Sequence, residues 1–394
     1  MKDFWAEQLQ SRRKIKLGKI AILIIVLILV IIVTILINQY IYDLDFRKWC
    51  DINILRKEIL QENTNYIELD GNEDTQVYAY DKYICILRKK KLEFYNKIGK
   101  QVETIELDIN KAIFTSTGRY LAISEEDGQK FYLICGKEKI FENEIEGSIN
   151  QINVSKNGYV SIVISNSSYK SIIDVYDKSG KQIFRTNLVT SRVVDISMSQ
   201  DSKYLAIAEV DISGILIKSS IQVVSIELAQ SDTSKAILYK YEAPIDKLIL
   251  NIEYQEKGKI ICMYSDSIDV LEDGNNKELL ELKNRKLAFA TINLNNKIAV
   301  LEEISTGEYT SDTQIKIINP TTLSTKEYIT NDVTKSIKAT ENKVAVNSGT
   351  ELYIVDTNGF LKKKYISETE INDIVMTNSL VGVIYRDKIQ IINL

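Results

Sequence analysis

The sequence predicts an all-β fold, a β-propeller of eight blades, preceded by one N-terminal transmembrane helix. Three observations predict it. A long apolar run lies near the N-terminus, a strand–turn–strand phrase recurs beyond it, and the recurrence interval is about 40 residues, the length of one propeller blade. The chain then divides into a basic cytoplasmic tail (1–19), the helix (20–42), a juxtamembrane helix or linker (43–63) and the propeller (64–394).

The apolar run reads IAILIIVLILVIIVTILINQYIY and contains no charged residue. At about 1.5 Å per residue, its strictly apolar part from Ile20 to Ile37, broken only by Thr34, spans roughly 27 Å, which matches the hydrocarbon core of a bilayer. An amphipathic helix of a soluble protein would need a polar face, and this segment has none. We therefore expect a membrane anchor that contacts lipid from Ile20 through Ile37 to Tyr42.

The charges that flank this run predict its orientation. Basic residues precede it, namely Lys2, Arg12, Arg13, Lys14, Lys16 and Lys19, whereas Asp43 and Asp45 follow it. Arg47 and Lys48 weaken the asymmetry, but the excess still places the N-terminus in the cytoplasm. The run is longer than the apolar region of a signal peptide, and no small-x-small cleavage motif follows it. We predict a single-pass protein of the cytoplasmic membrane with its propeller on the extracytoplasmic side.

Composition limits the partners of the large domain. The whole chain carries a net charge of −4, but its first 42 residues hold six basic and two acidic side chains. The remainder therefore has 44 basic and 52 acidic residues, or −8. A nucleic-acid or anionic-lipid platform would need clustered positive charge, so we expect no nucleic-acid partner.

The segment between helix and propeller has a helical period. Apolar residues recur at three- and four-residue intervals, at Phe46, Trp49, Ile52, Leu55, Ile59 and Leu60. This spacing predicts a short juxtamembrane helix that packs on the domain or lies at the lipid interface. A dimerising stalk is the alternative.

The large domain consists of repeats. The phrase DISMSQDSKYLAIAEV (195–210) aligns with AIFTSTGRYLAISEED (112–127) and INVSKNGYVSIVIS (152–165), each a strand, a small polar turn and a second strand. Equivalent positions recur at Tyr83, Tyr120, Tyr159, Tyr204, Ile260, Ile298, Val344 and Leu380. Each is followed by a third alternating strand. We count eight repeats, with seven as the alternative if one is degenerate.

The ring of blades must also close. A four-stranded sheet cannot bury both faces alone, so successive sheets stack around a central axis. The last repeat reaches only its third strand, 388–394, whereas NYIELD (65–70) precedes the first repeat and echoes the outer strand VETIELD (102–108). We expect the strand at 65–70 to complete the last blade.

These phrases resemble those of the WD40-like, quinoprotein-type β-propeller superfamily, in which a sequence such as SPDGKYLAVA links the inner strand to the second. The resemblance covers about 330 residues, although the proline is missing from SQDSKYLAIA, and the Gly-His and Trp-Asp dipeptides of true WD40 repeats are absent. The whole plan also resembles an uncharacterised family of Gram-positive anaerobes, a domain of unknown function with a membrane helix before a propeller. Membership implies a location without an activity.

Nothing in the sequence specifies a reaction. The chain has no histidine, the commonest general base near neutral pH, and its two tryptophans, Trp5 and Trp49, lie outside the propeller. Its four cysteines show no zinc spacing. Acidic turns at 70–74, 124–128 and 271–276 lack the ligand spacing of calcium loops. We expect no enzyme, catalytic residue, cofactor or metal; catalysis by an Asp/Glu pair is left open.

Insertions at 211–220, 230–236 and 304–312 exceed the regular blade length. Long loops are where propellers place recognition, with neutral drift in a surface hairpin as the alternative. Candidate partner-binding residues are Asp211, Lys218, Glu308 and Tyr309. We predict a membrane-anchored, extracytoplasmic propeller that is a non-catalytic binding or scaffold module for an envelope protein or polymer. The alternative is a propeller hydrolase or ligand sensor acting on a cell-wall or peptide ligand.

Overall fold

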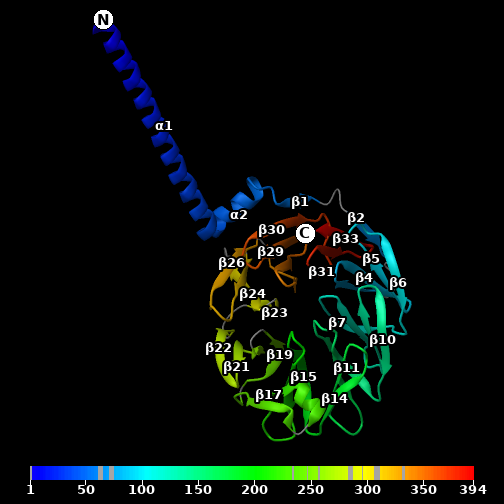
Figure 1. The fold of residues 1–394 in the computed structure, drawn as a ribbon. Coiled ribbons are helices and arrows are strands. Elements are labelled where there is room, and N and C mark those ends of the chain that lie inside the picture. The colour runs from blue at the N-terminus through cyan, green and yellow to red at the C-terminus, as the bar shows by residue number, and fades with distance from the viewer. Residues whose placement is uncertain are drawn as a thin grey trace. The chain divides into compact units, whose positions relative to one another are not determined.

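The computed structural model describes residues 2–60, 65–70, 75–232, 235–245, 247–255, 258–282, 287–294, 296–305, 311–330 and 333–394. The chain forms two compact units, Met1–Lys57 and Glu58–Leu394. The first is helical and the second is built from strands (Figure 1).

The long helix of the first unit is α1 (Lys2–Tyr42), so the predicted tail continues the same helix from Lys2. Among the described residues, one segment, Lys19–Tyr42, is long and apolar enough to cross a membrane, with a mean hydropathy of 3.9. None of its most apolar stretch is buried within the structure. The Thr34 hydroxyl donates to the Val30 carbonyl at 2.8 Å, so the polar group inside the apolar run is satisfied within the helix.

A second helix, α2 (Leu44–Asn53), follows at once. The Asp43 side chain caps it by accepting the Phe46 N–H at 3.0 Å. The Asp51 carboxylate is buried and accepts hydrogen bonds from the Tyr40 hydroxyl at 2.7 Å and the Lys57 ammonium at 2.6 Å. This network fixes α2 against the end of α1.

The helical period predicted from Phe46 to Leu60 was wrong beyond Asn53, because Leu55 follows the end of the helix and Ile59 and Leu60 lie in a strand. Helix α2 ends at Asn53, and both residues lie in the short strand β1 (Glu58–Leu60). Strand β1 pairs in parallel with β30 (Leu361–Ile366), because a sheet edge with unpaired backbone groups accepts a further strand.

The second unit is the predicted β-propeller, and in the part of the chain that the structure describes its strands form eight sheets. Blades 1 to 4 are β3 (Gln76–Tyr80), β4 (Tyr83–Arg88), β5 (Lys91–Tyr95), β6 (Gln101–Glu106); β7 (Ala112–Thr117), β8 (Tyr120–Glu125), β9 (Lys130–Cys135), β10 (Glu138–Glu144); β11 (Ser148–Val154), β12 (Val160–Ser165), β13 (Ser171–Tyr176), β14 (Gln182–Leu188); and β15 (Ser191–Met198), β16 (Tyr204–Asp211), β17 (Lys218–Ser225), β18 (Ile237–Glu242). Helix α3 (Ile226–Ser231) lies between β17 and β18.

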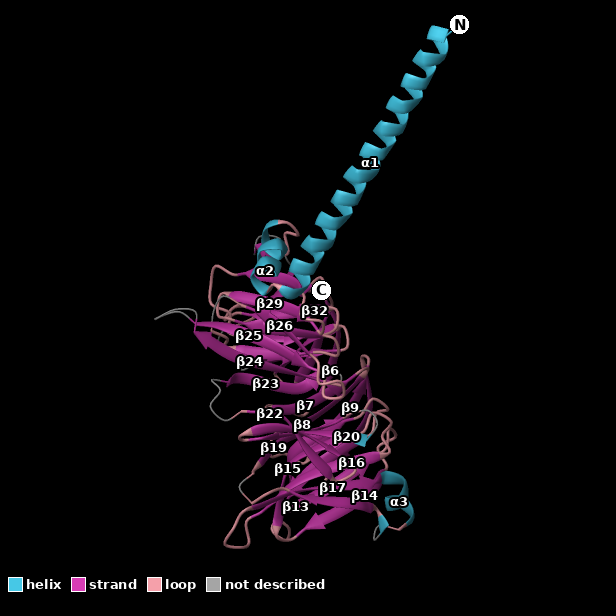
Figure 2. Ribbon diagram, turned by 90° about the vertical axis from the view of Figure 1, so that its left-hand side faces the viewer, coloured by secondary structure: helices cyan, strands magenta, loops and turns pink. Residues whose placement is uncertain are grey.

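Blades 5 to 8 follow the same order. They are β19 (Ile249–Tyr254), β20 (Lys259–Tyr264), β21 (Ser267–Glu272), β22 (Asn275–Glu281); β23 (Leu287–Leu294), β24 (Lys297–Ser305), β25 (Ser311–Ile318), β26 (Thr325–Ile329); β27 (Ser336–Ala339), β28 (Lys343–Asn347), β29 (Glu351–Asp356), β30; and β31 (Asp373–Met376), β32 (Leu380–Ile384), β33 (Lys388–Asn393) with β2 (Asn65–Glu68). Figure 2 shows the blades from the side. The prediction of eight blades is confirmed, and seven is ruled out.

The last blade combines both ends of the domain. Strand β2, within the segment expected to close the ring, pairs antiparallel with β33, with Ile67 opposite Ile389. Ile67 is 4% exposed and belongs to a core cluster with Ile84 and Ile86 of blade 1. The closing strand therefore also contributes to the interface between the last blade and the first.

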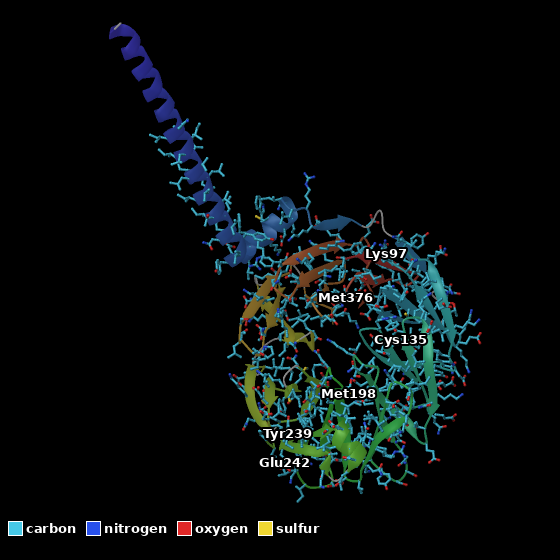
Figure 3. The ribbon with its side chains drawn as sticks, in the orientation of Figure 1. Lys97, Cys135, Met198, Tyr239, Glu242 and Met376 are labelled. Carbon is cyan, nitrogen blue, oxygen red and sulfur yellow. The ribbon has the colours of Figure 1, made fainter. Side chains whose placement is uncertain are left out.

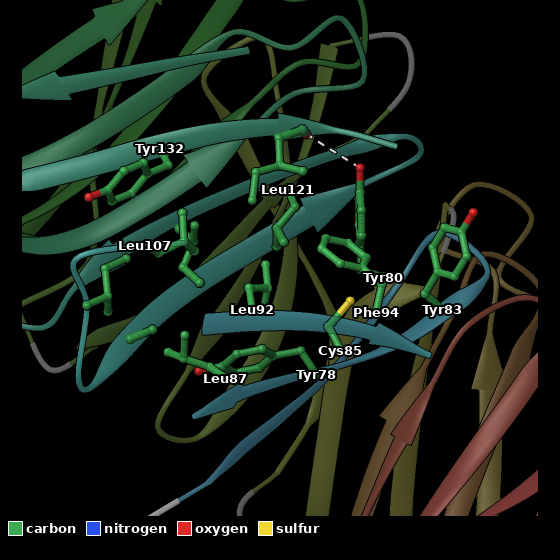
Figure 4. Close-up of a cluster of buried hydrophobic side chains, with 14 residues drawn as sticks. Tyr78, Tyr80, Tyr83, Cys85, Leu87, Leu92, Phe94, Leu107, Leu121 and Tyr132 are labelled. Atoms are coloured by element: carbon green, nitrogen blue, oxygen red, sulfur yellow. Dashed lines mark hydrogen bonds between the residues drawn. The ribbon is translucent and has the colours of Figure 1, made fainter. Parts of the chain in front are cut away.

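Neighbouring blades share their hydrophobic cores. Figure 4 shows the cluster between blades 1 and 2, where Phe94 and Leu92 of blade 1 lie with Leu121 of blade 2. The Tyr80 hydroxyl accepts the Gly136 N–H at 2.7 Å, so the polar end of a fully buried ring is satisfied by the next blade. Each blade thus covers apolar side chains of its neighbour that would otherwise face water.

Replacing Ile67 with alanine should lower the free energy of unfolding by about 2 to 4 kcal/mol, because the cavity would open in the closing blade. The matched control is Tyr66→Ala on the same strand. Tyr66 is 55% exposed, so a loss below about 1 kcal/mol is expected. Denaturant titration followed by circular dichroism measures both. Equal losses for the two variants would contradict closure through β2.

Candidate functional site

The first strands of the blades surround a central cavity of about 690 Å³. All eight blades contribute lining residues, so the cavity lies on the axis of the ring. Met198 from blade 4 and Met376 from blade 8 reach its lining from opposite sides (Figure 3). Most other lining side chains are polar, which distinguishes this cavity from the apolar cores between blades.

Polar side chains of the inner strands, some of them in the cavity lining, satisfy the open edge of a neighbouring inner strand. The Gln76 amide binds both backbone groups of Ala112, at 2.7 Å and 3.3 Å. The Thr117 hydroxyl donates to the Val154 carbonyl at 3.0 Å. The Gln151 amide donates to the carbonyl of Val194 at 2.5 Å. Neutral side chains therefore provide this edge pairing between blades 1, 2, 3 and 4.

Between blades 4 and 5 the same function falls to a carboxylate. Asp195 of β15 accepts the Ile252 N–H at 2.9 Å and the Asn251 side-chain amide at 2.7 Å. It also accepts the Ile196 N–H at 2.9 Å. Enclosure by the ring raises the pKa of Asp195 to about 6, although these three hydrogen bonds favour the ionised form.

A second carboxyl group, Glu253 of β19, faces Asp195 across the same blade junction. Desolvation is the main cause that raises the pKa of Glu253 to about 8, and repulsion from Asp195 adds to it. A hydrogen bond from Ser197 and the positive charge of Lys156 oppose the shift. Near neutral pH Asp195 is therefore largely ionised and Glu253 largely protonated.

The pair offers two carboxyl groups of different pKa on one side of the cavity. Among the described residues, no group of three or more His, Cys, Asp or Glu side chains is placed to hold a metal ion. The chemistry available here is hydrogen bonding, attraction of a cation and proton exchange with a ligand by carboxyl groups of unequal pKa.

The candidate loop residues lie away from this cavity. Asp211 and Lys218 are brought together as the last pair between β16 and β17, at the base of a hairpin. The tip of this hairpin exposes Ile212, Ile215 and Leu216. Glu308 and Tyr309 lie outside the described residues. The partner-binding role of the four residues stays a prediction.

Sequence reasoning missed Asp195 and Glu253. The signal that could have found them is the alternation of polar residues in a strand expected to lie innermost, as in Asn251, Glu253 and Gln255. Alternate positions of a strand share one face, so these three side chains had to point to a common space. Nothing in the sequence indicates that Asp195 lies opposite.

The raised pKa values predict how stability depends on pH. Between about pH 5 and about pH 8 the folded protein binds more protons than the unfolded chain, so the free energy of unfolding should fall as the pH rises. Glu253→Gln should remove most of this slope and stabilise the protein at about pH 8 by about 3 kcal/mol, after allowance for water in the cavity.

Denaturant titrations across this pH range measure the effect. Glu138→Gln, on the exposed outer strand β10, is the control that removes one carboxylate without touching the cavity. If Glu253→Gln and Glu138→Gln had the same pH profile, Glu253 would not titrate as described.

One family model, described as a family of unknown function (DUF5711), matches residues 57–394. No curated protein matches the sequence significantly. Among solved structures, Sqt1 from Chaetomium thermophilum, bound to the N-terminus of a ribosomal protein, has a TM-score of 0.54 at 10% identity, covering 86% of this chain and 100% of that chain. BamB from Moraxella catarrhalis has a TM-score of 0.49 at 11% identity, covering 84% of this chain and 99% of that chain. The likeness to Sqt1 concerns the fold alone.

Proposed function

We propose that this chain, which belongs to the DUF5711 family, is a membrane-anchored, non-catalytic propeller that binds or organises an envelope protein or polymer. The observation that carries the proposal is the apolar segment Lys19–Tyr42, whose side chains find no burial within the protein, followed by a closed propeller. A helix of this kind needs lipid around it. The basic residues before it support a cytoplasmic N-terminus and a propeller outside.

A propeller is suited to binding because its loops and central face are held by a rigid scaffold. Sqt1, which shares the fold, holds a segment of another protein. In the present chain the hairpin between β16 and β17 offers exposed aliphatic side chains flanked by Asp211 and Lys218. These features support a protein partner.

A ligand sensor or hydrolase acting on a cell-wall or peptide ligand is the second candidate. The observation that favours it is the Asp195–Glu253 pair in a cavity of small-molecule size. Carboxyl groups with pKa values near 6 and 8 are suited to proton transfer near neutral pH.

The location can be tested with a reporter fused after Leu394. A phosphatase that is active only outside the cytoplasm should be active, and a fluorescent protein that folds only inside should be dark. Replacing Arg12, Arg13, Lys14 and Lys16 with glutamine should reduce the exported fraction, because the charge bias would be lost. A cytoplasmic C-terminus in the unsubstituted chain would overturn the proposed location.

The binding role can be tested by crosslinking the full chain in its membrane. We expect a discrete partner whose yield falls several-fold in the double variant Ile215→Ser, Leu216→Ser, with Ile98→Ser, an exposed site in a turn of blade 1, as the control. A hydrolase screen of the full chain in detergent runs in parallel. Activity that Glu253→Gln or Asp195→Asn abolishes would overturn the non-catalytic role in favour of the second candidate.

A further inference from the structure

Elsewhere in the ring, neutral side chains perform the inner-strand pairing that Asp195 performs between blades 4 and 5. The inner-strand edges between blades 1, 2, 3 and 4 are paired by glutamine and threonine side chains. Asp195 performs this pairing with an added charge, whereas the structure gives the Glu253 carboxyl group no backbone partner and one hydrogen bond, from Ser197. A neutral side chain would serve in both places at lower desolvation cost.

A second, independent feature of the cavity also calls for a ligand. Gln255, two residues after Glu253 and on the same face of the chain, is only 5% exposed. It lines the cavity, and its side-chain Nε2 has no hydrogen-bond partner among the residues that the structure describes. A buried amide without a partner costs free energy that a bound polar group would recover. The Thr115 hydroxyl of blade 2, also in the lining, is likewise buried without a partner among the described residues.

The charges around the cavity define the kind of ligand. Its lining carries four acidic side chains and two basic ones, namely Asp81, Asp195, Glu253, Glu341, Arg119 and Lys156. Of these, Lys156 and Asp195 are the charges that act on Glu253. A carboxylate pair with this surplus of negative charge attracts a cation. Because the described residues offer no group of three or more His, Cys, Asp or Glu ligands, an organic cation with N–H donors fits better than a metal ion.

We propose that the central cavity is a binding site for a small polar molecule carrying a primary ammonium group, which donates hydrogen bonds to Asp195 and Glu253. The rest of the ligand contacts the amide of Gln255 and the hydroxyl groups of the lining. The cavity volume of about 690 Å³ is within the range of small-molecule sites. This inference names the ligand class for the second candidate function and rests on it, but it does not depend on membrane attachment.

Binding of an ammonium group should be linked to pH. The ammonium group favours the ionised form of Glu253, which is mostly protonated below its pKa of about 8. Affinity should therefore rise as the pH rises from about 6 to about 8, and the ligand should displace a proton from Glu253. A site that recognised only hydroxyl groups would show no such dependence.

The test is calorimetric titration of the full chain in detergent, in phosphate because amine buffers would compete. The probes are ethanolamine and spermidine, each compared with a neutral counterpart, ethylene glycol and triethylene glycol. Calcium chloride tests the metal and is titrated separately in cacodylate, because calcium phosphate would precipitate. We expect the ammonium probes to bind at least about tenfold more tightly than their counterparts. Glu253→Gln and Asp195→Asn should each weaken them about tenfold or more, and Glu138→Gln should not.

Several results would overturn the proposal. These are equal affinity for charged and neutral probes, binding of calcium but of neither amine, and an unchanged pH profile in Glu253→Gln. Circular dichroism of each variant separates lost binding from lost folding. Failure of the amine titration with intact crosslinking would overturn this inference alone. A cytoplasmic C-terminus would overturn the proposed location and leave the titration unaffected.

Discussion

The structure depends on the closure of the ring. Each blade has two faces and can cover only part of its own apolar surface, so the first and last blades must meet. They meet because β2, from the N-terminal end of the domain, pairs with β33 at the C-terminal end. Ile67 then lies in one core cluster with Ile84 of blade 1 and Ile389 of blade 8. Without this pairing the apolar surfaces of both blades would face water.

The strand before β2 likewise pairs with a strand near the C-terminal end of the domain, in blade 7. Strand β1 joins β30 as a fifth strand, and Lys364, only 4% exposed, holds Glu58 at 3.4 Å and Glu351 at 2.7 Å. The segment that connects the helical unit to the propeller is therefore paired to two successive blades. The backbone hydrogen bonds of this segment are all lost only if β1 separates from β30 and β2 separates from β33.

Much of this fold could be predicted from the sequence because it depends on local and periodic signals. The recurrence of the polar turn before Tyr204 predicts the length of a blade. The similarity of 65–70 to the outer strand in 102–108 predicts how the ring closes. The short strand β1 could not be predicted, because Ile59 and Leu60 continue a helical spacing and are recruited by the free edge of β30, a tertiary contact. The candidate site was missed for the same reason. Asp195 and Glu253 are far apart in sequence and meet only when blades 4 and 5 are stacked.

The inner strands around the central cavity show two uses of polar side chains that differ in their energetic cost. Gln76 and Thr117 satisfy backbone groups and remain neutral, so they stabilise the ring at every pH. Asp195 and Glu253 carry ionisable carboxyl groups, and their raised pKa values mean that the folded state loses stability as they ionise. The carboxyl pair therefore destabilises the fold near neutral pH, and the Gln255 amide beside it lacks a partner among the described residues. A bound cation would explain both features, because it would supply the opposite charge and further hydrogen bonds. Binding of the ligand to the folded state alone would then raise the free energy of unfolding of the propeller. Ligand binding and ring closure would therefore both shift the equilibrium between the folded and the unfolded propeller.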